Sequence, residues 1–299
     1  MEVLSEEQVR SALTYDALLP AVERALIDLS AGRIQQPVRT ILSIPEHGGR
    51  FALMPASDGE LMGVKLVTVY EDNRTLPTHQ AVIQLLSART GEPLAVMDGR
   101  LITEMRTAVV SALATQLLAR PDAQVLAILG SGVQARSHLR ALRRVRSFRE
   151  VRVWSRTAGN ARRLAEEFDV TTFDTAEGAV RGADVVVSVS SVSEPLVRGA
   201  WLGRQTLVCA VGAVGPHMRE LDDDAMEAAI VVESSAAALR ESGDLIGSGQ
   251  TVYGELGELL AGARPKPAGR VVFKSLGVAA EDLAAAALVW KNWQEKKGN

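Results

Sequence analysis

Residues 125–138, VLAILGSGVQARSH, constrain the fold more than any other part of this sequence. A short apolar run leads into GSGVQA at residues 130–135, which matches G-x-G-x-x-A, and a polar, helix-compatible segment follows. In such a turn the first glycine permits a sharp bend, the second lets a pyrophosphate approach the backbone, and the alanine allows close helix packing. The helix N-terminus then offers unpaired N–H groups to the phosphates. A purely structural turn is the alternative, so the surrounding pattern decides.

From residue 124 onward, short apolar runs alternate with helical or loop segments. These runs are QVLAIL, VRVW, ADVVVSVS, TLVCAVG and AIVVES. Such alternation predicts a parallel sheet that is covered on both faces. In this context the glycine turn indicates dinucleotide binding. We therefore predict an α/β fold whose residues 119–276 form a Rossmann-type dinucleotide-binding domain.

The preceding half of the chain has a different pattern of apolar residues. SEEQ at residues 5–8 matches a helix-capping box, and residues 16–31 repeat apolar positions at helical spacing. Strand-like stretches follow, and ARTGE is a plausible hairpin loop between the last two of them. A long helix is expected at 102–119, and the final helical stretch EDLAAAALVWKNW is expected to return to this half. Residues 1–118 with 277–299 are thus predicted to form an α+β domain for substrate binding and dimerisation.

Composition excludes several classes of function. The 33 basic and 36 acidic residues nearly cancel, and no basic block interleaves with aromatic residues, so we expect no nucleic-acid partner. No apolar run approaches the roughly 18 residues that a membrane span needs, and the N-terminus lacks the pattern of a signal peptide. The single cysteine, Cys209, excludes an internal disulfide and fits a reducing compartment. We expect a cytoplasmic protein without a metal site.

The end of the second strand in the later half indicates which dinucleotide binds. NAD-selective folds usually place Asp or Glu about 20 residues beyond the glycines, where it binds the ribose hydroxyls. Here VRVWSRT supplies Ser155, Arg156 and Thr157 and no acid. A cation between two hydroxyl groups suits a 2′-phosphate, so we predict NADPH in preference to NADH. The alternative is an arginine that is merely exposed.

Further cofactor contacts are expected in the glycine turn and at the ends of the other parallel strands. Ligands of such sheets bind outside the carboxyl ends of the strands. The candidates at these places are Gly130, Ser131, Gly132, Val133, Gln134, Ser190, Ser191, Val192, Val211 and Gly212.

A series of motifs, in chain order, resembles the ornithine cyclodeaminase/mu-crystallin family over nearly the whole chain, and most of all its mu-crystallin branch of ketimine reductases. The motifs are QPVRT (36–40), KLVTVYED (65–72), PTHQA (77–81), AVMDG (95–99), ILGSGVQA (128–135), VWSRT (153–157), RELDD (219–223), ESGD (241–244) and VFKSLG (272–277). The resemblance implies a homodimer whose first domain, completed by the C-terminal helix, supplies the dimer contact and the substrate site. It also implies NAD(P)H-dependent reduction of cyclic imino acids.

These expectations combine into one predicted function and several alternatives. The predicted function is NADPH-dependent reduction of cyclic ketimines, imino acids of the pyrroline- or piperideine-2-carboxylate type, to cyclic amino acids. Because some family members bind thyroid hormone, the main alternative is a protein that binds NADPH and such a hormone without turnover. Ornithine cyclodeaminase and amino-acid dehydrogenase are further alternatives.

A cyclic ketimine carboxylate requires a site that fixes an anion and supplies a proton. Arg39 and Arg106 are candidates for the carboxylate clamp, because a guanidinium can bond both oxygens at once; Arg106 is also a candidate cofactor contact. Alone, either arginine could be a surface ion-pair partner. Lys65 lies inside the apolar run GVKLVTV and matches the family's active-site lysine, which implies proton donation to the imine nitrogen. From the pattern alone, its side chain could instead emerge into solvent.

Other site residues follow mainly from the resemblance. It implies that the ESGD loop closes over the substrate, so that Asp244 orients Lys65 or contacts the imine nitrogen and Glu241 lines the pocket. Thr78 and His79 match positions that contact the nicotinamide half of the cofactor, and Ser275 matches a substrate contact. A solvated carboxylate and a structural histidine are the plain alternatives for Asp244 and His79.

At one position this sequence departs from the cyclodeaminase pattern, and that position distinguishes cyclisation from imine reduction. In cyclodeaminases the Met-Pro pair is preceded by an acid, in the pattern E-x-M-P, and that glutamate helps deamination and ring closure. Here the stretch is Ala52-Leu53-Met54-Pro55. Since alanine cannot exchange a proton, we predict imine reduction and not ornithine cyclisation.

Overall fold

The computed structural model describes residues 1–298, which divide into two compact units. Unit 1 comprises Met1–Arg106 and the segment from Gly277 to the C-terminus, and unit 2 comprises Thr107–Leu276. The first boundary therefore falls inside helix α3 (Arg100–Leu118), whereas the sequence pattern predicts it at 118/119. Apolar residues continue at helical spacing through the whole of α3, so no change of pattern marks the boundary.

Unit 1 is built on a six-stranded sheet. In spatial order its strands are β1 (Glu2–Leu4), β6 (Pro93–Asp98), β5 (His79–Ser87), β4 (Leu61–Tyr70), β3 (Gly49–Ser57) and β2 (Thr40–Ile44). β1 pairs with β6 in parallel, and the other neighbours are antiparallel. The predicted hairpin between the last two strands is confirmed as β5 and β6.

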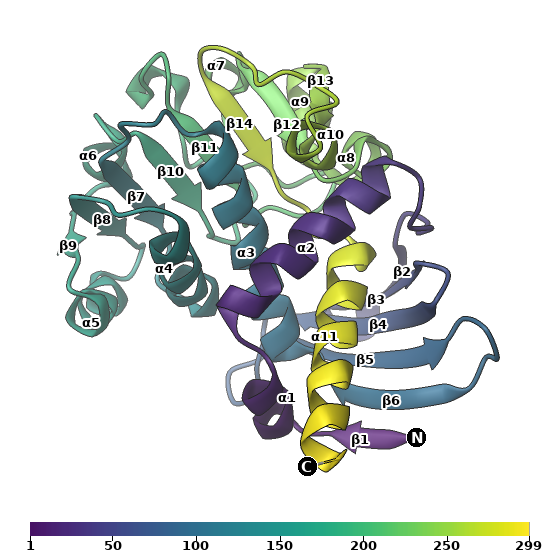
Figure 1. The fold of residues 1–299 in the computed structure, drawn as a ribbon. Helices are drawn as coiled ribbons and strands as arrows, with labels where there is room; N and C mark the ends of the chain where they lie inside the picture. Colours follow the sequence, from purple (N-terminus) through teal and green to yellow (C-terminus); the bar gives the residue numbers. More distant parts are fainter. Residues whose placement is uncertain (299) are drawn as a thin grey trace. The chain divides into compact units, whose positions relative to one another are not determined.

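Helices cover one face of this sheet. They are α1 (Glu6–Ala12), α2 (Tyr15–Ser30) and α11 (Ala279–Gly298), with a short 3₁₀ turn, η1 (Pro45–His47), between β2 and β3. The capping box predicted at Ser5 is present. α11 contacts β3, β4 and β5 and packs against α2, and Figure 1 shows it crossing the strands.

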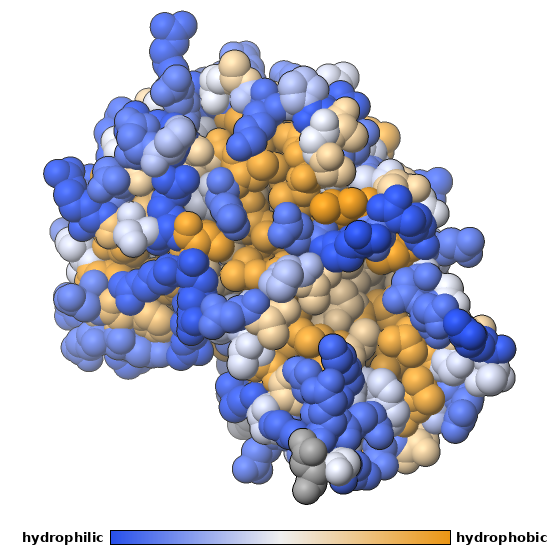
Figure 2. Space-filling view, viewed as in Figure 1, coloured by the Kyte–Doolittle hydropathy of each residue, from blue (hydrophilic) through white to orange (hydrophobic). Residues whose placement is uncertain are grey.

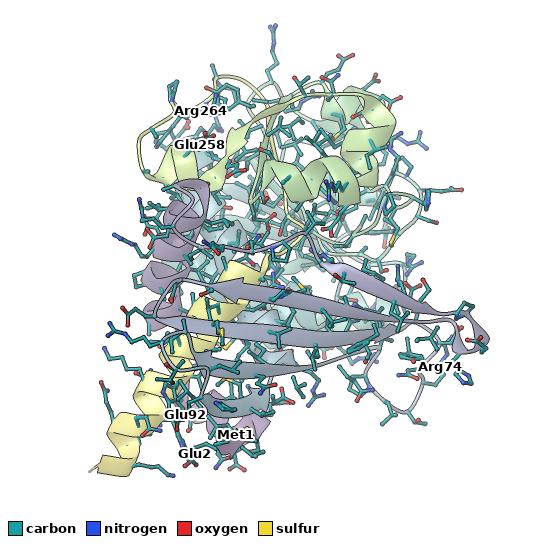
Figure 3. The ribbon with its side chains drawn as sticks, turned by 90° about the vertical axis from the view of Figure 1, so that its right-hand side faces the viewer. Met1, Glu2, Arg74, Glu92, Glu258 and Arg264 are labelled. Carbon is teal, nitrogen blue, oxygen red and sulfur yellow. The ribbon has the colours of Figure 1, made fainter. Side chains whose placement is uncertain are left out.

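The two faces of this sheet have different surroundings, because successive residues of a strand point to opposite sides. Lys65 stands beside Met54 and Ile83 in the register, and all three side chains are buried on the face that α11 covers. Leu66 and Val82 pair on the opposite face, where Val82 is exposed. Figure 3 shows the strands in front and α11 behind them.

Unit 2 is built on an eight-stranded sheet in which every pairing is parallel. In spatial order the strands are β13 (Val252–Glu255), β12 (Ala229–Val232), β14 (Val271–Lys274), β11 (Leu207–Ala210), β10 (Val185–Ser188), β7 (Val125–Leu129), β8 (Glu150–Trp154) and β9 (Thr171–Thr172). Every residue of β7, β10, β11 and β14 is buried. The predicted α/β fold with a Rossmann-type sheet is confirmed.

The helices of unit 2 connect these strands (Figure 1). Besides the rest of α3 they are α4 (Val133–Val145), α5 (Ala158–Phe168), α6 (Ala176–Val180), α7 (Asp223–Met226), α8 (Ser235–Glu241), α9 (Gly243–Ser248) and α10 (Leu256–Leu260), with a 3₁₀ turn η2 (Gly199–Trp201). The chain leaves β7 toward β8 on one side, and β10 lies on the other side. Strand order thus reverses at β7, which is where open parallel sheets bind ligands.

The surface is mixed in polarity. Hydrophilic side chains cover the last turns of α11, whereas its first turns are buried (Figure 2). None of the helices within residues 1–298 combines the length and the apolarity that crossing a membrane would need.

Candidate active site

The turn between β7 and α4 has the geometry of a phosphate-binding loop. Gly130 has φ +137°, and a Cβ atom there would lie 2.9 Å from Cγ2 of Val189, so the fold itself requires glycine. Gly132 is different: a Cβ atom on it would meet nothing within 4 Å. Its open side and the first-turn N–H groups of α4, which no side chain of residues 1–298 caps, leave room for an anion.

The end of β8 lies beside this turn. Oγ of Ser131 and Oγ of Ser155 are 2.8 Å apart. Arg156 and Thr157 follow and are exposed. Among the ion pairs of residues 1–298 none involves Arg156, so its guanidinium remains available to an external anion.

The ends of β10 and β11 pack closely against the same edge of the sheet. The hydroxyl of Ser190 donates to the carbonyl of Leu129 at 3.0 Å. A Cβ atom on Gly212 would lie 2.1 Å from the carbonyl oxygen of Ser190, so only glycine fits there. The predicted cofactor residues of unit 2 thus gather along the carboxyl ends of β7, β8, β10 and β11. The remaining members of that set are Val133 and Gln134 in the first turn of α4, Ser191 and Val192 after β10, and Val211 after β11.

Unit 1 contains a buried cluster of charged side chains. Nζ of Lys65 lies 2.7 Å from Oδ2 of Asp282. Nε of Arg106 donates to Oδ1 of Asp282 at 3.0 Å, and its Nη1 donates to Oε2 of Glu281 at 2.7 Å. β4 supplies the lysine, α3 the arginine and the first turn of α11 both acids. Asp282 therefore bridges the two predicted substrate residues, and Glu281 binds Arg106.

Burial sets the protonation chemistry of this cluster. Burial lowers the pKa of Lys65 to about 8, and the charge of Arg106 acts in the same direction while Asp282 opposes it. For Asp282 burial raises the pKa, but Arg106 and Lys65 outweigh burial and hold the pKa below its usual value. Near neutral pH the lysine is thus a cation that can release a proton beside a carboxylate that stays ionised.

Arg39, Thr78 and His79 also belong to unit 1. Arg39 is half-buried, and its Nη2 donates to the carbonyl of Gly277 at 2.7 Å, just before α11. Thr78 and His79 are exposed at the start of β5, with 3.1 Å between Oγ1 of Thr78 and Nδ1 of His79. They follow the loop that joins β4 to β5, whose Arg74 stands out from the sheet in Figure 3.

Lys65 and Asp244, which the resemblance implies act together, each have an ion partner within their own unit. Asp282 is the ion partner of Lys65, while Asp244 belongs to a second buried cluster, in unit 2. Its Oδ1 accepts the N–H groups of Glu220 and Leu221, and its Oδ2 lies 3.0 Å from Nζ of Lys274. In this structure Asp244 therefore holds a loop and a lysine within its own unit.

Glu241 and Ser275 are likewise placed in unit 2. Glu241 ends α8 and is buried. The hydroxyl of Ser275 donates to Oε1 of Glu233 at 2.6 Å, and Oε2 of Glu233 accepts the N–H of Leu276 at 3.0 Å. Glu233 thus fixes the backbone that leaves β14.

Sequence reasoning missed both acids of the unit 1 cluster, and it missed Glu220 and Lys274 in the unit 2 cluster, where only Asp244 was a candidate. Glu281 and Asp282 form the only acidic pair in the alanine-rich start of α11, and charges on an otherwise buried helix are a usable signal. Lys274 interrupts the apolar run VVFKSLG as Lys65 interrupts GVKLVTV. It lies 3.0 Å from Glu220, and both are fully buried.

Each unit carries chemical groups that a reductase needs. Unit 2 offers a phosphate-binding turn with an exposed cation at the next strand end. Unit 1 offers a buried lysine that can give up a proton and arginines that can bind a carboxylate. No group of three or more metal-ligating side chains is assembled within residues 1–298.

Comparison with known proteins gives matches over nearly the whole chain. The family model of the ornithine cyclodeaminase/mu-crystallin family matches residues 1–297. Ketimine reductase mu-crystallin of Mus musculus is 44% identical, with 98% of each chain covered. Delta(1)-pyrroline-2-carboxylate reductase of Bacillus cereus is 32% identical over 99% of this chain and 98% of its own. The Thermococcus litoralis Delta(1)-pyrroline-2-carboxylate reductase, solved with NADH and L-proline, superposes with a TM-score of 0.94 at 33% identity, covering 99% and 98%. This chain belongs to the ornithine cyclodeaminase/mu-crystallin family.

Proposed function

We propose that this chain catalyses the NADPH-dependent reduction of cyclic ketimines, imino acids of the pyrroline- or piperideine-2-carboxylate type, to cyclic amino acids. Its broader class, an imine-reducing oxidoreductase, is that of its reductase relatives from mouse and Bacillus cereus. A nicotinamide dinucleotide as cofactor agrees with the NADH-bound Thermococcus litoralis neighbour.

The buried ion pair between Lys65 and Asp282, with Arg106 beside it, is the observation that carries this proposal. Reduction converts one C=N bond to a CH–NH single bond and consumes one hydride and one proton. A nicotinamide dinucleotide held at the turn between β7 and α4 would supply the hydride. Lys65 supplies the proton to the imine nitrogen, which makes the carbon more electrophilic, and regains a proton from solvent afterwards.

The charges of unit 1 favour a substrate with one carboxylate. The formal charges of Lys65, Arg106 and Arg39 sum to +3, and those of Glu281 and Asp282 sum to −2. One positive charge is left for the substrate, and a guanidinium binds a carboxylate through two parallel hydrogen bonds. We assign this contact to Arg39 and Arg106.

Several features of unit 2 support NADPH as the cofactor. The open side of Gly132 and the N-terminus of α4 suit the pyrophosphate. Ser155, Arg156 and Thr157 present a cation and two hydroxyls where an NAD-selective fold places an acid. Arg156 would bind the 2′-phosphate, and the residues after β10 and β11 would hold the nicotinamide half.

A homodimer forms part of the proposal. The face of the unit 1 sheet that α11 does not cover carries apolar side chains, among them Leu53, Leu66 and Val82. Val82 is 44% exposed. An apolar sheet face of this kind is buried in many oligomers.

The direct test is to add a cyclic imino acid to the purified protein and NADPH and follow loss of NADPH absorbance. Δ1-pyrroline-2-carboxylate and Δ1-piperideine-2-carboxylate should be reduced, with proline and pipecolate as products, and NADPH should be used more efficiently than NADH. Ornithine should not be cyclised, because Ala52 replaces the acid of the cyclodeaminase pattern. Stoichiometric NADPH binding without consumption would overturn the proposal and favour a binding protein.

A further inference from the structure

We propose that Asp282 is a positioning residue that holds Lys65 charged and in place, and that its neighbour Glu281 instead restrains Arg106. This division of roles rests on the proposed function, because it assigns tasks within the proposed reductase site. The two acids are adjacent in the sequence and chemically alike, and both contact Arg106, but Asp282 also forms the ion pair with Lys65.

The geometry separates the two acids. Successive residues of a helix point in directions about 100° apart. From the first turn of α11, Asp282 reaches Nζ of Lys65 at 2.7 Å with one oxygen and Nε of Arg106 at 3.0 Å with the other. Glu281 reaches Nη1 of Arg106 at 2.7 Å. Lys65 has its ion pair with Asp282 and none with Glu281.

The first turn of α11 is itself anchored to unit 1. The N–H of Ala280 donates to Oε1 of Gln36 at 2.8 Å, and Arg39 donates to the carbonyl of Gly277 at 2.7 Å. Both contacts come from the QPVRT segment. Because the acids stand on an anchored turn, the carboxylate of Asp282 fixes the direction in which Nζ of Lys65 points.

Asp282 also opposes the groups that lower the pKa of Lys65. Burial and the charges of Arg106 and Arg39 lower the pKa of Lys65 to about 8, and the charge of Asp282 acts in the other direction. The charged or titratable groups around the lysine are Arg39 before β2, His79 on β5, Arg106 on α3, and Glu281 and Asp282 on α11. Removing the charge of Asp282 leaves cations around a buried cation, so Lys65 must lose its proton at a lower pH.

The experiment compares Asp282→Asn with Glu281→Gln, two neutral replacements at adjacent positions. In the wild type, kcat should fall as Lys65 loses its proton above about pH 8. Asp282→Asn should move this fall downward by roughly 1–3 pH units, the effect of removing an opposite charge at close range. Glu281→Gln should leave the fall where it is and raise KM for the imino acid. Wild-type turnover tests the proposed function, and the pH shift tests the roles of the acids.

Two outcomes would overturn the inference: an unmoved profile in Asp282→Asn, or equal shifts in both variants. If Asp282→Asn does not fold, Asp282→Glu takes its place. Asp282→Glu keeps the negative charge but moves it away from Nζ of Lys65. The pH at which kcat falls should therefore stay the same, while kcat itself decreases. An unchanged kcat would contradict the positioning role. NMR of 13C-labelled lysines gives the Lys65 titration without turnover, so the same shift can be measured even if no imine is reduced.

Discussion

Oγ of Ser131 and Oγ of Ser155 lie 2.8 Å apart, which ties the glycine turn after β7 to the end of β8. The residue after Ser155 is the exposed Arg156. The position of its backbone is therefore fixed relative to the turn that would hold the pyrophosphate. If NADPH is the cofactor, as proposed, Arg156 would contact its 2′-phosphate from this position.

Replacing Arg156 by alanine should weaken NADPH binding by roughly 1.5–3 kcal/mol, the contribution of a hydrogen bond to a charged group. NADH binding should change little, because NADH lacks the 2′-phosphate. Fluorescence titration with each cofactor measures both effects. Arg162→Ala, an equal loss of charge at an exposed position of α5, is the control. Equal losses for NADPH and NADH would refute the assignment.

Replacing Lys65 by methionine keeps most of the apolar stem and removes the proton. Turnover of a cyclic imine should fall by roughly 10²–10⁴, the usual contribution of general acid catalysis, with NADPH affinity unchanged. Lys266→Met, at an exposed position, should retain full turnover. If Lys65→Met keeps more than about a tenth of the wild-type rate, less than the usual loss, Lys65 is not the acid.

Gly277 supports the charged cluster through its lack of a side chain. Its φ is +69°, and a Cβ atom would lie 2.2 Å from Nη1 of Arg106. Gly262 has nearly the same φ, +70°, but open space around it. Both alanine variants should lose roughly 1–2 kcal/mol of stability for the left-handed backbone, measured by urea unfolding. Only Gly277→Ala should also lose imine reduction, because it displaces the guanidinium; equal activity in both variants would contradict this.

His138 gives unit 2 a pH-dependent stability. It is fully buried on α4, with Nε2 3.0 Å from Oγ of Ser111 and Nδ1 2.8 Å from the carbonyl oxygen of Gln134. The carbonyl can only accept, so Nδ1 carries the proton and Nε2 accepts from the serine. Burial lowers the pKa of His138 to about 4, from the usual 6.5.

The direction of this change in stability with pH follows from proton binding. Between pH 6.5 and about 4 the unfolded chain holds a proton on this residue that the folded chain lacks, so stability falls with decreasing pH. The contribution is complete above pH 6.5, and roughly 3 kcal/mol should be lost by pH 4. Unfolding in urea at several pH values, compared with His138→Gln, isolates this loss from that of the carboxylates. If His138→Gln shows the same pH dependence as the wild type, His138 is not the source of this loss.

The dimer prediction concerns the sheet face that carries Val82. Light scattering should give the mass of a dimer for the wild type, and Val82→Lys should give a monomer, because a charge on the apolar face opposes burial. Leu239→Lys changes an apolar residue of α8 that is 61% exposed and should remain dimeric. A wild-type monomer at micromolar concentration would remove the prediction.

The sequence predicts best what local pattern determines. The parallel sheet of unit 2 is visible as apolar runs. In unit 1, Lys65 is visible because its charge interrupts the apolar run GVKLVTV. The pattern does not identify Asp282 as the partner of Lys65, since nothing in an alanine-rich helix indicates which strand it will cover. The three-residue β1 is missed for a similar reason, because only its pairing with β6 makes it a strand.

The position of strand β14 in the sheet affects how unit 2 folds during synthesis. It lies between β11 and β12 and pairs with both, although it follows every other strand of residues 1–298 in the chain. On the ribosome, β11 and β12 emerge with one edge each unpaired until Val271–Lys274 has followed. β11 and β12 therefore become joined in one sheet only after β14 has been synthesised. An interrupted chain presents two apolar strand edges, which are surfaces prone to aggregation.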